Sequence, residues 1–228
     1  MPANAGAHNN LGNTFAEAGR LDEAMAEYAK ALWLVPDYAD AHADLANALV
    51  KKGRYPEAVE NYHAALRFRP DDSAVHYGLG LALLRSGTPG AAIDEFGRAV
   101  RLDPENANAW SNLGELLAAA ARWPEAADAY AQATRLRPES VDARVNYGNV
   151  LEELGRFPEA VREYQVALEM QPSAPDIHNN LGSLLAGSGR LAEARREFEE
   201  ALRLRPDYTE ARDNLEHVLR LERSESGQ

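Results

Sequence analysis

The sequence repeats itself with a period of 34 residues, six times, without an insertion or deletion between Ala5 and Tyr208. A small residue recurs at Gly12, Ala46, Gly80, Gly114, Gly148 and Gly182. An alanine recurs at Ala24, Ala58, Ala92, Ala126, Ala160 and Ala194, and a proline at Pro36, Pro70, Pro104, Pro138, Pro172 and Pro206. Periods of this length are typical of stacked supersecondary units, each of which buries its apolar face against its neighbours. The period therefore predicts one elongated array.

Each unit is predicted to be a helical hairpin. In the fifth unit, apolar residues at three- and four-residue spacing mark two amphipathic helices. Their apolar stripes are Tyr147, Gly148 and Leu151 in the first helix and Ala160, Tyr164 and Ala167 in the second. Gly155 is expected to end the first helix in the left-handed conformation, and Pro158 to lie in the first turn of the second. Pro172 then ends the pair.

The pattern resembles the tetratricopeptide repeat family. Its motif is seen most fully in the fourth unit, as Trp110, Leu113, Gly114, Leu117, Ala126, Tyr130, Ala133 and Pro138. The resemblance implies an all-α solenoid, a right-handed superhelix whose first helices line a concave groove. The expected organisation is a tail at 1–4, six repeats at 5–38, 39–72, 73–106, 107–140, 141–174 and 175–208, a capping helix at 209–223 and a disordered tail at 224–228.

Two units depart from the pattern. Residues 88–91 replace the usual turn sequence of the third unit with Thr-Pro-Gly-Ala, so that turn is expected to differ locally. Ala121 stands where the fourth unit needs the left-handed glycine, at a cost of about 1 kcal/mol if that geometry is kept. At the start of the array, Leu11 and Phe15 lie on a first helix without a polar cap.

Composition excludes several classes of function. The formal net charge of −12 argues against nucleic acid, which is bound through clustered Lys and Arg. The chain has no cysteine, so disulfides, Cys-ligated zinc and thiol catalysis are absent. No stretch resembles a membrane span or a signal peptide, and we expect a cytoplasmic protein that does not bind membranes. The preference for Arg over Lys and the abundant Ala fit a GC-rich bacterial genome.

No catalytic, cofactor or metal site is predicted. Histidines recur at the fourth position of the repeat, as His8, His42, His76 and His178. Equivalent positions lie about 10 Å apart in such an array, too far for one zinc ion with bonds of about 2 Å, so packing is the favoured interpretation. Adjacent acidic pairs such as Glu152 and Glu153 point about 100 degrees apart on a helix and form no acid and base pair.

The predicted site is a row of polar residues along the groove that the resemblance implies. Asparagine offers two donors and an acceptor, so a spaced row pairs with a peptide backbone regardless of its sequence. This resembles the asparagine ladder of O-linked N-acetylglucosamine transferases. The alternative is that these asparagines stabilise helix contacts. The candidate partner-binding residues are Asn10, Asn13, Asp44, Asn47, Tyr77, Leu81, Asn112, Asn146, Asn149, Asn179, Asn180 and Asn214.

The same groove positions are predicted to be acidic and to favour neutral or basic peptides. The only cations at these groove positions are Lys51 and Arg85. Chaperone-binding repeats use several Lys and Arg residues there as a carboxylate clamp, so this role is excluded. In the third unit, Gly78 beside Tyr77 has two interpretations, a shallow apolar niche for one anchoring side chain or imperfect drift of the repeat. The acidic groove residues are Glu17, Asp40, Asp44, Glu115, Asp142, Glu152, Glu153, Asp176, Glu210 and Asp213.

The leading hypothesis is a non-enzymatic scaffold that binds an extended peptide or a partner protein in this groove. Two alternatives stay open. One is a substrate-recruiting module of a larger enzyme such as a glycosyltransferase, and the other is self-association through the uncapped first repeat. The sequence does not identify the partner, because one fold hosts many recognition tasks.

Overall fold

The computed structural model describes residues 4–226, which form thirteen α-helices joined by short loops and contain no β-strand. This confirms the all-α class and the predicted helical hairpins. The first helices of successive hairpins begin at residues 5, 39, 73, 107, 141, 175 and 209, an interval of 34 residues. The helices are α1 (Ala5–Glu17), α2 (Leu21–Leu34), α3 (Ala39–Lys51), α4 (Tyr55–Phe68), α5 (Ser73–Arg85), α6 (Pro89–Leu102), α7 (Ala107–Ala119), α8 (Trp123–Leu136), α9 (Val141–Glu153), α10 (Phe157–Met170), α11 (Pro175–Gly187), α12 (Leu191–Leu204) and α13 (Thr209–Ser226).

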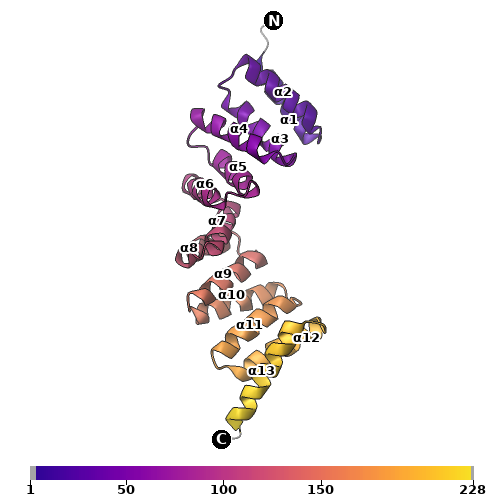
Figure 1. Cartoon of the computed structure of the whole chain (residues 1–228), viewed down its shortest axis with the longest axis vertical. Coiled ribbons are helices and arrows are strands. Elements are labelled where there is room, and N and C mark those ends of the chain that lie inside the picture. The colour runs from indigo at the N-terminus through magenta and orange to yellow at the C-terminus, as the bar shows by residue number, and fades with distance from the viewer. Residues whose placement is uncertain (1–3, 227–228) are drawn as a thin grey trace. The chain divides into compact units, whose positions relative to one another are not determined.

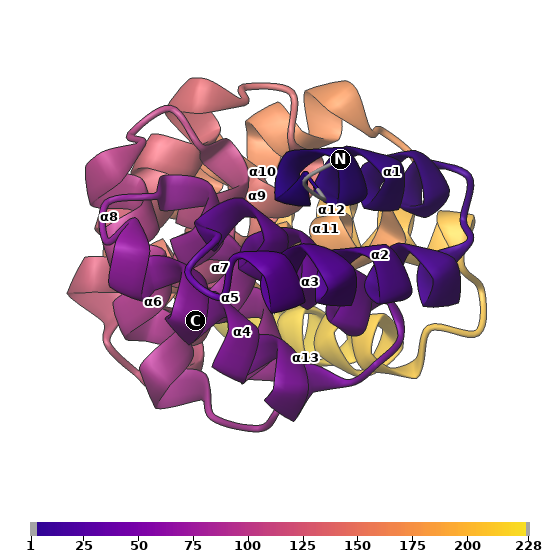
Figure 2. The same ribbon diagram turned by 90° about the horizontal axis from the view of Figure 1, so that it is seen from above.

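The chain divides into two compact units, Met1–Leu113 and Gly114–Gln228, with the boundary inside α7. In the first unit, α1 packs on α2, α3 on α4 and α5 on α6, and α1 and α2 lie side by side in both views (Figures 1 and 2). In the second unit, α9 packs on α10 and α11 on α12. First helices of neighbouring hairpins also touch, as α1 and α3 do in the first unit and α11 and α13 in the second.

An aromatic ring held against a helix backbone forms the centre of each hairpin. In α1, a Cβ added to Gly12 would lie 2.4 Å from a ring carbon of Tyr28 in α2. In α9, a Cβ on Gly148 would lie 2.7 Å from the ring of Tyr164 in α10. Tyr28 and Tyr164 are almost completely buried. The small residue of each period is therefore needed for close approach of the two helices, not for backbone flexibility.

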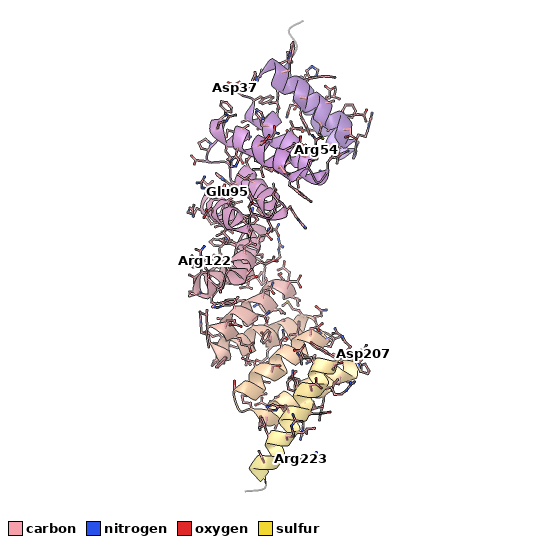
Figure 3. The ribbon with its side chains drawn as sticks, viewed as in Figure 1. Asp37, Arg54, Glu95, Arg122, Asp207 and Arg223 are labelled. Atoms are coloured by element: carbon pink, nitrogen blue, oxygen red, sulfur yellow. The ribbon has the colours of Figure 1, made fainter. Side chains whose placement is uncertain are left out.

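The turn inside each hairpin has one repeated geometry. In the fifth, Gly155 has a φ of 69°, and the N–H of Arg156 donates to the carbonyl of Leu151 at 2.8 Å. This pattern satisfies carbonyls left over at the end of the first helix. Arg54 and Arg122 lie at the equivalent turns of their hairpins (Figure 3), where each forms an ion pair with the glutamate three residues later.

The third turn has the same backbone as the others, so the expected local difference is confined to side chains. Gly87 has a φ of 80°, and the N–H of Thr88 donates to the carbonyl of Leu83 at 3.0 Å. The Thr88 hydroxyl donates to that same carbonyl at 2.9 Å. Residue 91 is alanine, so this hydroxyl takes the place of the Arg-to-Glu ion pair of the other turns.

The two ends differ in part from the expected tails. Asn4 caps α1 by accepting the N–H of Gly6 at 3.0 Å, and residues 1–3 lie outside the described residues. The expected tail at 224–228 does not begin at 224, because α13 continues to Ser226, and 227–228 lie outside the described residues. No helix-breaking residue occurs between 209 and 226, and the Ser224 hydroxyl donates to the carbonyl of Leu221 at 2.7 Å. Within the described range, every helix is too short or too polar to cross a lipid bilayer.

We predict that Ala121→Gly stabilises the protein. Ala121 has a φ of 55°, a left-handed conformation that costs a residue with a Cβ about 1–2 kcal/mol. The greater freedom of glycine in the unfolded chain offsets part of this gain. We expect the free energy of unfolding in urea to rise by about 0.5–1 kcal/mol. Gly155→Ala is the matched control and should lower it; an unchanged stability of Ala121→Gly would contradict the geometry.

Candidate functional site

The asparagines at the ninth position of three hairpins hold a tyrosine of the second helix. Asn149 Oδ1 accepts the hydroxyl of Tyr164 at 2.6 Å. The same bond links Asn47 to Tyr62 at 2.6 Å, and Asn13 accepts from Tyr28 at 2.7 Å. Where the second helix carries phenylalanine instead, as in the third and sixth hairpins, the ninth position holds Leu81 or Ser183. The tyrosine thus uses one acceptor position of each amide oxygen, and both N–H donors of the amide stay available to a ligand.

A second set of polar contacts joins first helices of neighbouring hairpins in the first unit. The buried Asn9 donates from Nδ2 to Asp44 Oδ2 at 2.8 Å. Asn112 Nδ2 donates to the Tyr77 hydroxyl at 3.3 Å. In both pairs the fifth residue of one repeat meets the sixth residue of the next. These bonds use part of the hydrogen-bonding capacity of three predicted site residues, Asp44, Tyr77 and Asn112.

The same contact recurs in the second unit, between α11 and α13. Asn179 is 1% exposed, accepts from Asn214 Nδ2 at 3.1 Å and donates to Glu210 Oε1 at 3.3 Å. Asn214 also lies 3.4 Å from the hydroxyl of Ser183. Asn179 therefore joins helices rather than facing solvent, as the alternative interpretation of the asparagine row proposed.

The remaining candidates are more accessible. Asn10 and Asn146 are exposed, Asn180 is half-buried, and Leu81 is half-buried in α5. Asn146 forms a side-chain hydrogen bond with Tyr130, which leaves part of its amide accessible to a ligand. The asparagine row is thus a mixture of structural amides and accessible ones, and the repeat position alone does not distinguish them.

The predicted apolar niche at Gly78 is filled. A Cβ added to Gly78 would lie 2.7 Å from the hydroxyl of Tyr62, whose side chain occupies that space. Tyr77 packs on Phe96, with ring centroids 5.7 Å apart at 51°. The glycine therefore accommodates a tyrosine of the preceding hairpin, and no anchoring pocket results.

The second unit contains an open cleft of about 770 Å³. It contains three of the predicted residues, Asn146, Asn149 and Asn180. Its wall carries five carboxylates and three large aromatic side chains, and none of its lining residues is Lys or Arg. The lining residues are Glu115, Ala118, Trp123, Tyr130, Asp142, Asn146, Asn149, Val150, Glu152, Glu153, Tyr164, Asn180, Ser183 and Glu210.

Burial changes the acidity of two groups in this cleft. It raises the pKa of the Glu152 carboxyl, although a hydrogen bond with Tyr164 partly opposes the shift and Glu153 adds to it. Burial also raises the pKa of Tyr130 to about 12, with a further contribution from the charge of Glu115. A cation in the cleft would reverse the effect on Glu152, because an opposite charge favours the carboxylate.

A smaller hollow of about 220 Å³ occupies the equivalent place in the first unit. Asn13, Asn47 and Asp44 line it together with Glu17 and Lys51. Here two carboxylates face one cation, so the acidic character predicted for the whole groove is much weaker. The two units therefore present different electrostatic surfaces from the same repeat positions.

The histidine row forms polar bridges that sequence reasoning did not anticipate. His76 Nδ1 lies 2.6 Å from Glu95 Oε2, and its Nε2 lies 2.8 Å from the Pro70 carbonyl. Glu95 projects from α6 (Figure 3). His178 makes the same two contacts, to Glu197 at 2.6 Å and to Pro172 at 3.1 Å. In the described part of the chain, no three His, Asp or Glu residues are grouped to hold a metal ion.

A pairing in the sequence could have revealed these bridges. The residue nineteen positions after the histidine is Glu27, Asn61, Glu95 or Glu197, an acceptor in every case. Where the fourth position is Trp110, the partner position is Ala129. The two positions vary together along the array, as expected for side chains in direct contact.

Comparison with known proteins agrees with this fold. The sequence matches the family described as the cilia and flagella-associated protein 70 C-terminal domain, a tetratricopeptide-repeat family, over residues 2–219. No curated protein is significantly similar in sequence. The solved structure of YrrB, described as a tetratricopeptide-repeat protein with an unusual peptide-binding site, has 24% identity and a TM-score of 0.76, covering 81% of this chain and 95% of YrrB.

Two further solved structures have the same fold. A crystal structure of MamA has 25% identity and a TM-score of 0.66, covering 71% of this chain and 94% of MamA. PilF of Pseudomonas aeruginosa has 21% identity and a TM-score of 0.68, covering 92% of this chain and 95% of its own.

We predict that Tyr164→Phe lowers the free energy of unfolding by about 0.5–1.5 kcal/mol, because the ring stays while the bond to Asn149 is lost. Urea denaturation measures the change. Tyr147→Phe is the control, since the Tyr147 hydroxyl makes no hydrogen bond among the described residues. Equal losses in both variants would show that the Tyr164 hydroxyl does not hold the hairpin.

Proposed function

We propose that this chain, which belongs to the tetratricopeptide-repeat family of the cilia and flagella-associated protein 70 C-terminal domain, is a non-enzymatic interaction scaffold. Its ligand is an extended peptide or an extended segment of a partner protein, neutral to basic in charge. The observation that supports this most directly is the cleft of the second unit, which combines carboxylates, aromatic rings and asparagine amides without a lining cation. YrrB, which shares this fold, is described as having a peptide-binding site.

The cleft offers three kinds of contact to a peptide. Carboxylates such as Glu153 and Asp142 attract Lys and Arg side chains and steer their approach. Aromatic rings at Trp123 and Tyr130 provide faces for the alkyl or guanidinium groups of those side chains. Asn149 keeps its two N–H donors, because Tyr164 uses its oxygen, and these donors suit backbone carbonyls of the ligand.

The first unit, taken by itself, presents a more neutral surface. Asn13 and Asn47 again present N–H donors beside a small hollow, but Lys51 offsets part of the charge of Glu17 and Asp44. A basic segment of a partner therefore suits the cleft of the second unit, and a neutral segment suits the hollow of the first unit.

A charge-matched variant pair tests the role of the cleft. Glu152→Gln combined with Glu153→Gln should weaken binding of a basic peptide by about 3- to 30-fold, since an exposed pair contributes up to about 1 kcal/mol. Glu139→Gln with Glu169→Gln changes the net charge equally at exposed positions outside the cleft. Fluorescence anisotropy with basic, neutral and acidic peptides of equal length measures the affinities. Equal weakening by both double variants would contradict a specific cleft.

The amides are tested separately from the charges. Asn146→Ala combined with Asn180→Ala should weaken basic and neutral peptides alike by up to about tenfold, because each amide supplies about one net hydrogen bond. Raising the salt concentration to about 0.5 M should reduce the carboxylate effect and leave the amide effect, since screening acts on charges. Circular dichroism and thermal melting confirm that the variants are folded. Unchanged affinity for the neutral peptide would remove the amides from the site.

A second candidate function is self-association through α1. Leu11 is 42% exposed, whereas its equivalent Leu79 in α5 is fully buried against a neighbouring hairpin. Sedimentation velocity over a wide concentration range should then show a weak oligomer that Leu11→Ser abolishes. A constant sedimentation coefficient in the parent chain would exclude this candidate and leave the peptide-binding proposal intact.

A further inference from the structure

The junction between consecutive hairpins is held by a side-chain N–H at the fourth position of the repeat. In the second unit, Arg144 Nε donates to the carbonyl of Pro138 at 2.9 Å, six residues earlier. In the first unit, Trp110 Nε1 donates to the carbonyl of Pro104 at 2.9 Å. His42, His76 and His178 contact the equivalent carbonyls of Pro36, Pro70 and Pro172 at 3.0, 2.8 and 3.1 Å.

The same side chain also reaches the second helix of its own hairpin. Arg144 Nη1 donates to Glu163 Oε2 at 2.9 Å, while His178 Nδ1 lies 2.6 Å from Glu197 Oε2. One residue thus joins three segments, namely the first helix, the second helix and the loop that precedes the hairpin. We call this three-way contact the junction clamp.

The three residue types at this position, Arg, Trp and His, differ in how they hold their protons. Arg keeps all its N–H donors at any accessible pH, and the Trp indole has one donor that does not titrate. A histidine ring has two N–H donors only when it is protonated, and one when it is neutral. Both ring nitrogens of His178 face oxygen acceptors, so both contacts are hydrogen bonds only with the imidazolium ring.

We propose that the His178 clamp is a pH-sensitive element of the array, closed when the ring is protonated and half-released when it is neutral. The neutral ring keeps one donor, so it releases either the second helix or the preceding loop. The Arg144 clamp stays closed throughout. Deprotonation of the His178 ring therefore loosens the junction that this ring holds, while the junction held by Arg144 is unchanged.

The charges around these rings act in the expected direction. His178 faces Glu197 and Glu200 of α12 and the uncharged carbonyl of Pro172, and the hydrogen bond to Glu197 raises the pKa of the His178 ring. A folded-state pKa above the unfolded value of 6.5 makes the stabilisation complete below that pH. It is lost as the pH rises through the folded-state pKa.

The surroundings of His76 contain charges of both signs. Glu95 accepts from His76 and also lies 3.8 Å from Arg98 of the same helix. Glu60, His63 and Arg67 of α4 line the same hollow as Glu95. The experiment therefore uses His178, whose charged neighbours are glutamates.

Amide hydrogen exchange of the parent chain tests the clamp directly. From about pH 5.5 to about pH 8.5, a range that brackets the ordinary imidazole pKa, protection in residues 171–178 should fall about fivefold after correction for the intrinsic rate. Residues 137–144, which contain the Arg144 clamp, should keep their protection. Parallel changes in the two segments would overturn the proposal.

Two reciprocal substitutions assign the effect to the ring. His178→Arg should abolish the pH dependence in residues 171–178 while preserving their protection, as Arg144 does. Arg144→His should introduce the pH dependence in residues 137–144, where Glu163 is the acceptor. If His178→Arg does not fold, Arg144→His still decides the matter. A His178 variant that keeps the pH dependence, or an Arg144 variant that does not acquire it, would refute the clamp.

Titration of the histidine ring provides an independent measurement. Long-range proton–nitrogen NMR spectra of the folded chain should give His178 a higher apparent pKa than the same residue has in urea. Both ring nitrogens should show the protonated form at the acidic end. A folded-state pKa at or below the value in urea would mean that the two acceptors do not hold the proton, and would overturn the proposal.

Discussion

The structure depends on the contact between a large aromatic ring and a helix position with almost no side chain. Where Gly148 faces Tyr164, a single methyl group would come within 2.7 Å of the ring. Tyr164 and its equivalents Phe96 and Phe198 are buried almost completely. Close packing of this kind tolerates little change in volume. It sets the distance between the two helices of a hairpin, and the other contacts of each hairpin form at that distance.

The polar residues of the first helices follow from this spacing. In the first, second and fifth hairpins the second helix carries a tyrosine whose hydroxyl donates to an asparagine of the first helix, as Tyr164 does to Asn149. When the second helix carries phenylalanine, as at Phe96, no acceptor is needed and Leu81 occupies the position. Much of the asparagine pattern is thus a consequence of packing. The groups of these amides that remain for a ligand are chiefly their N–H donors.

The fold was predictable from the sequence because its signals are local and repeated. The 34-residue interval of the helices was visible in the period, and the left-handed turn at Ala121 followed from its place in the repeat. The site was less predictable. Asn179 and Asn146 are both asparagines, at the fifth and sixth positions of their repeats, yet Asn179 is buried and Asn146 is exposed. Their difference depends on Asn214 and Tyr130, which the position of a residue within one repeat does not reveal.

The histidines show why residue type alone was insufficient. Their spacing argues against a shared metal ion and favours packing, but packing describes only part of their role, because both ring nitrogens of His178 also face oxygen acceptors. The sequence does indicate this role, because the residue nineteen positions later changes together with the histidine. His76 is followed by Glu95 at that distance, whereas Trp110 is followed by Ala129.

The half-used amides also limit how this surface can recognise a partner. An amide whose oxygen already accepts from Tyr164 keeps both N–H donors and one acceptor position, so most of its remaining hydrogen-bonding capacity suits ligand carbonyls. Backbone carbonyls occur in every peptide, so such contacts give affinity without sequence preference. Selectivity must therefore come from the side chains around the amides. In the second unit these are carboxylates and aromatic rings, and in the first unit Lys51 weakens the same charge. Under the proposed peptide-binding function, the repeat supplies contacts that any peptide can make, and the residues that vary between repeats set the preference for one partner.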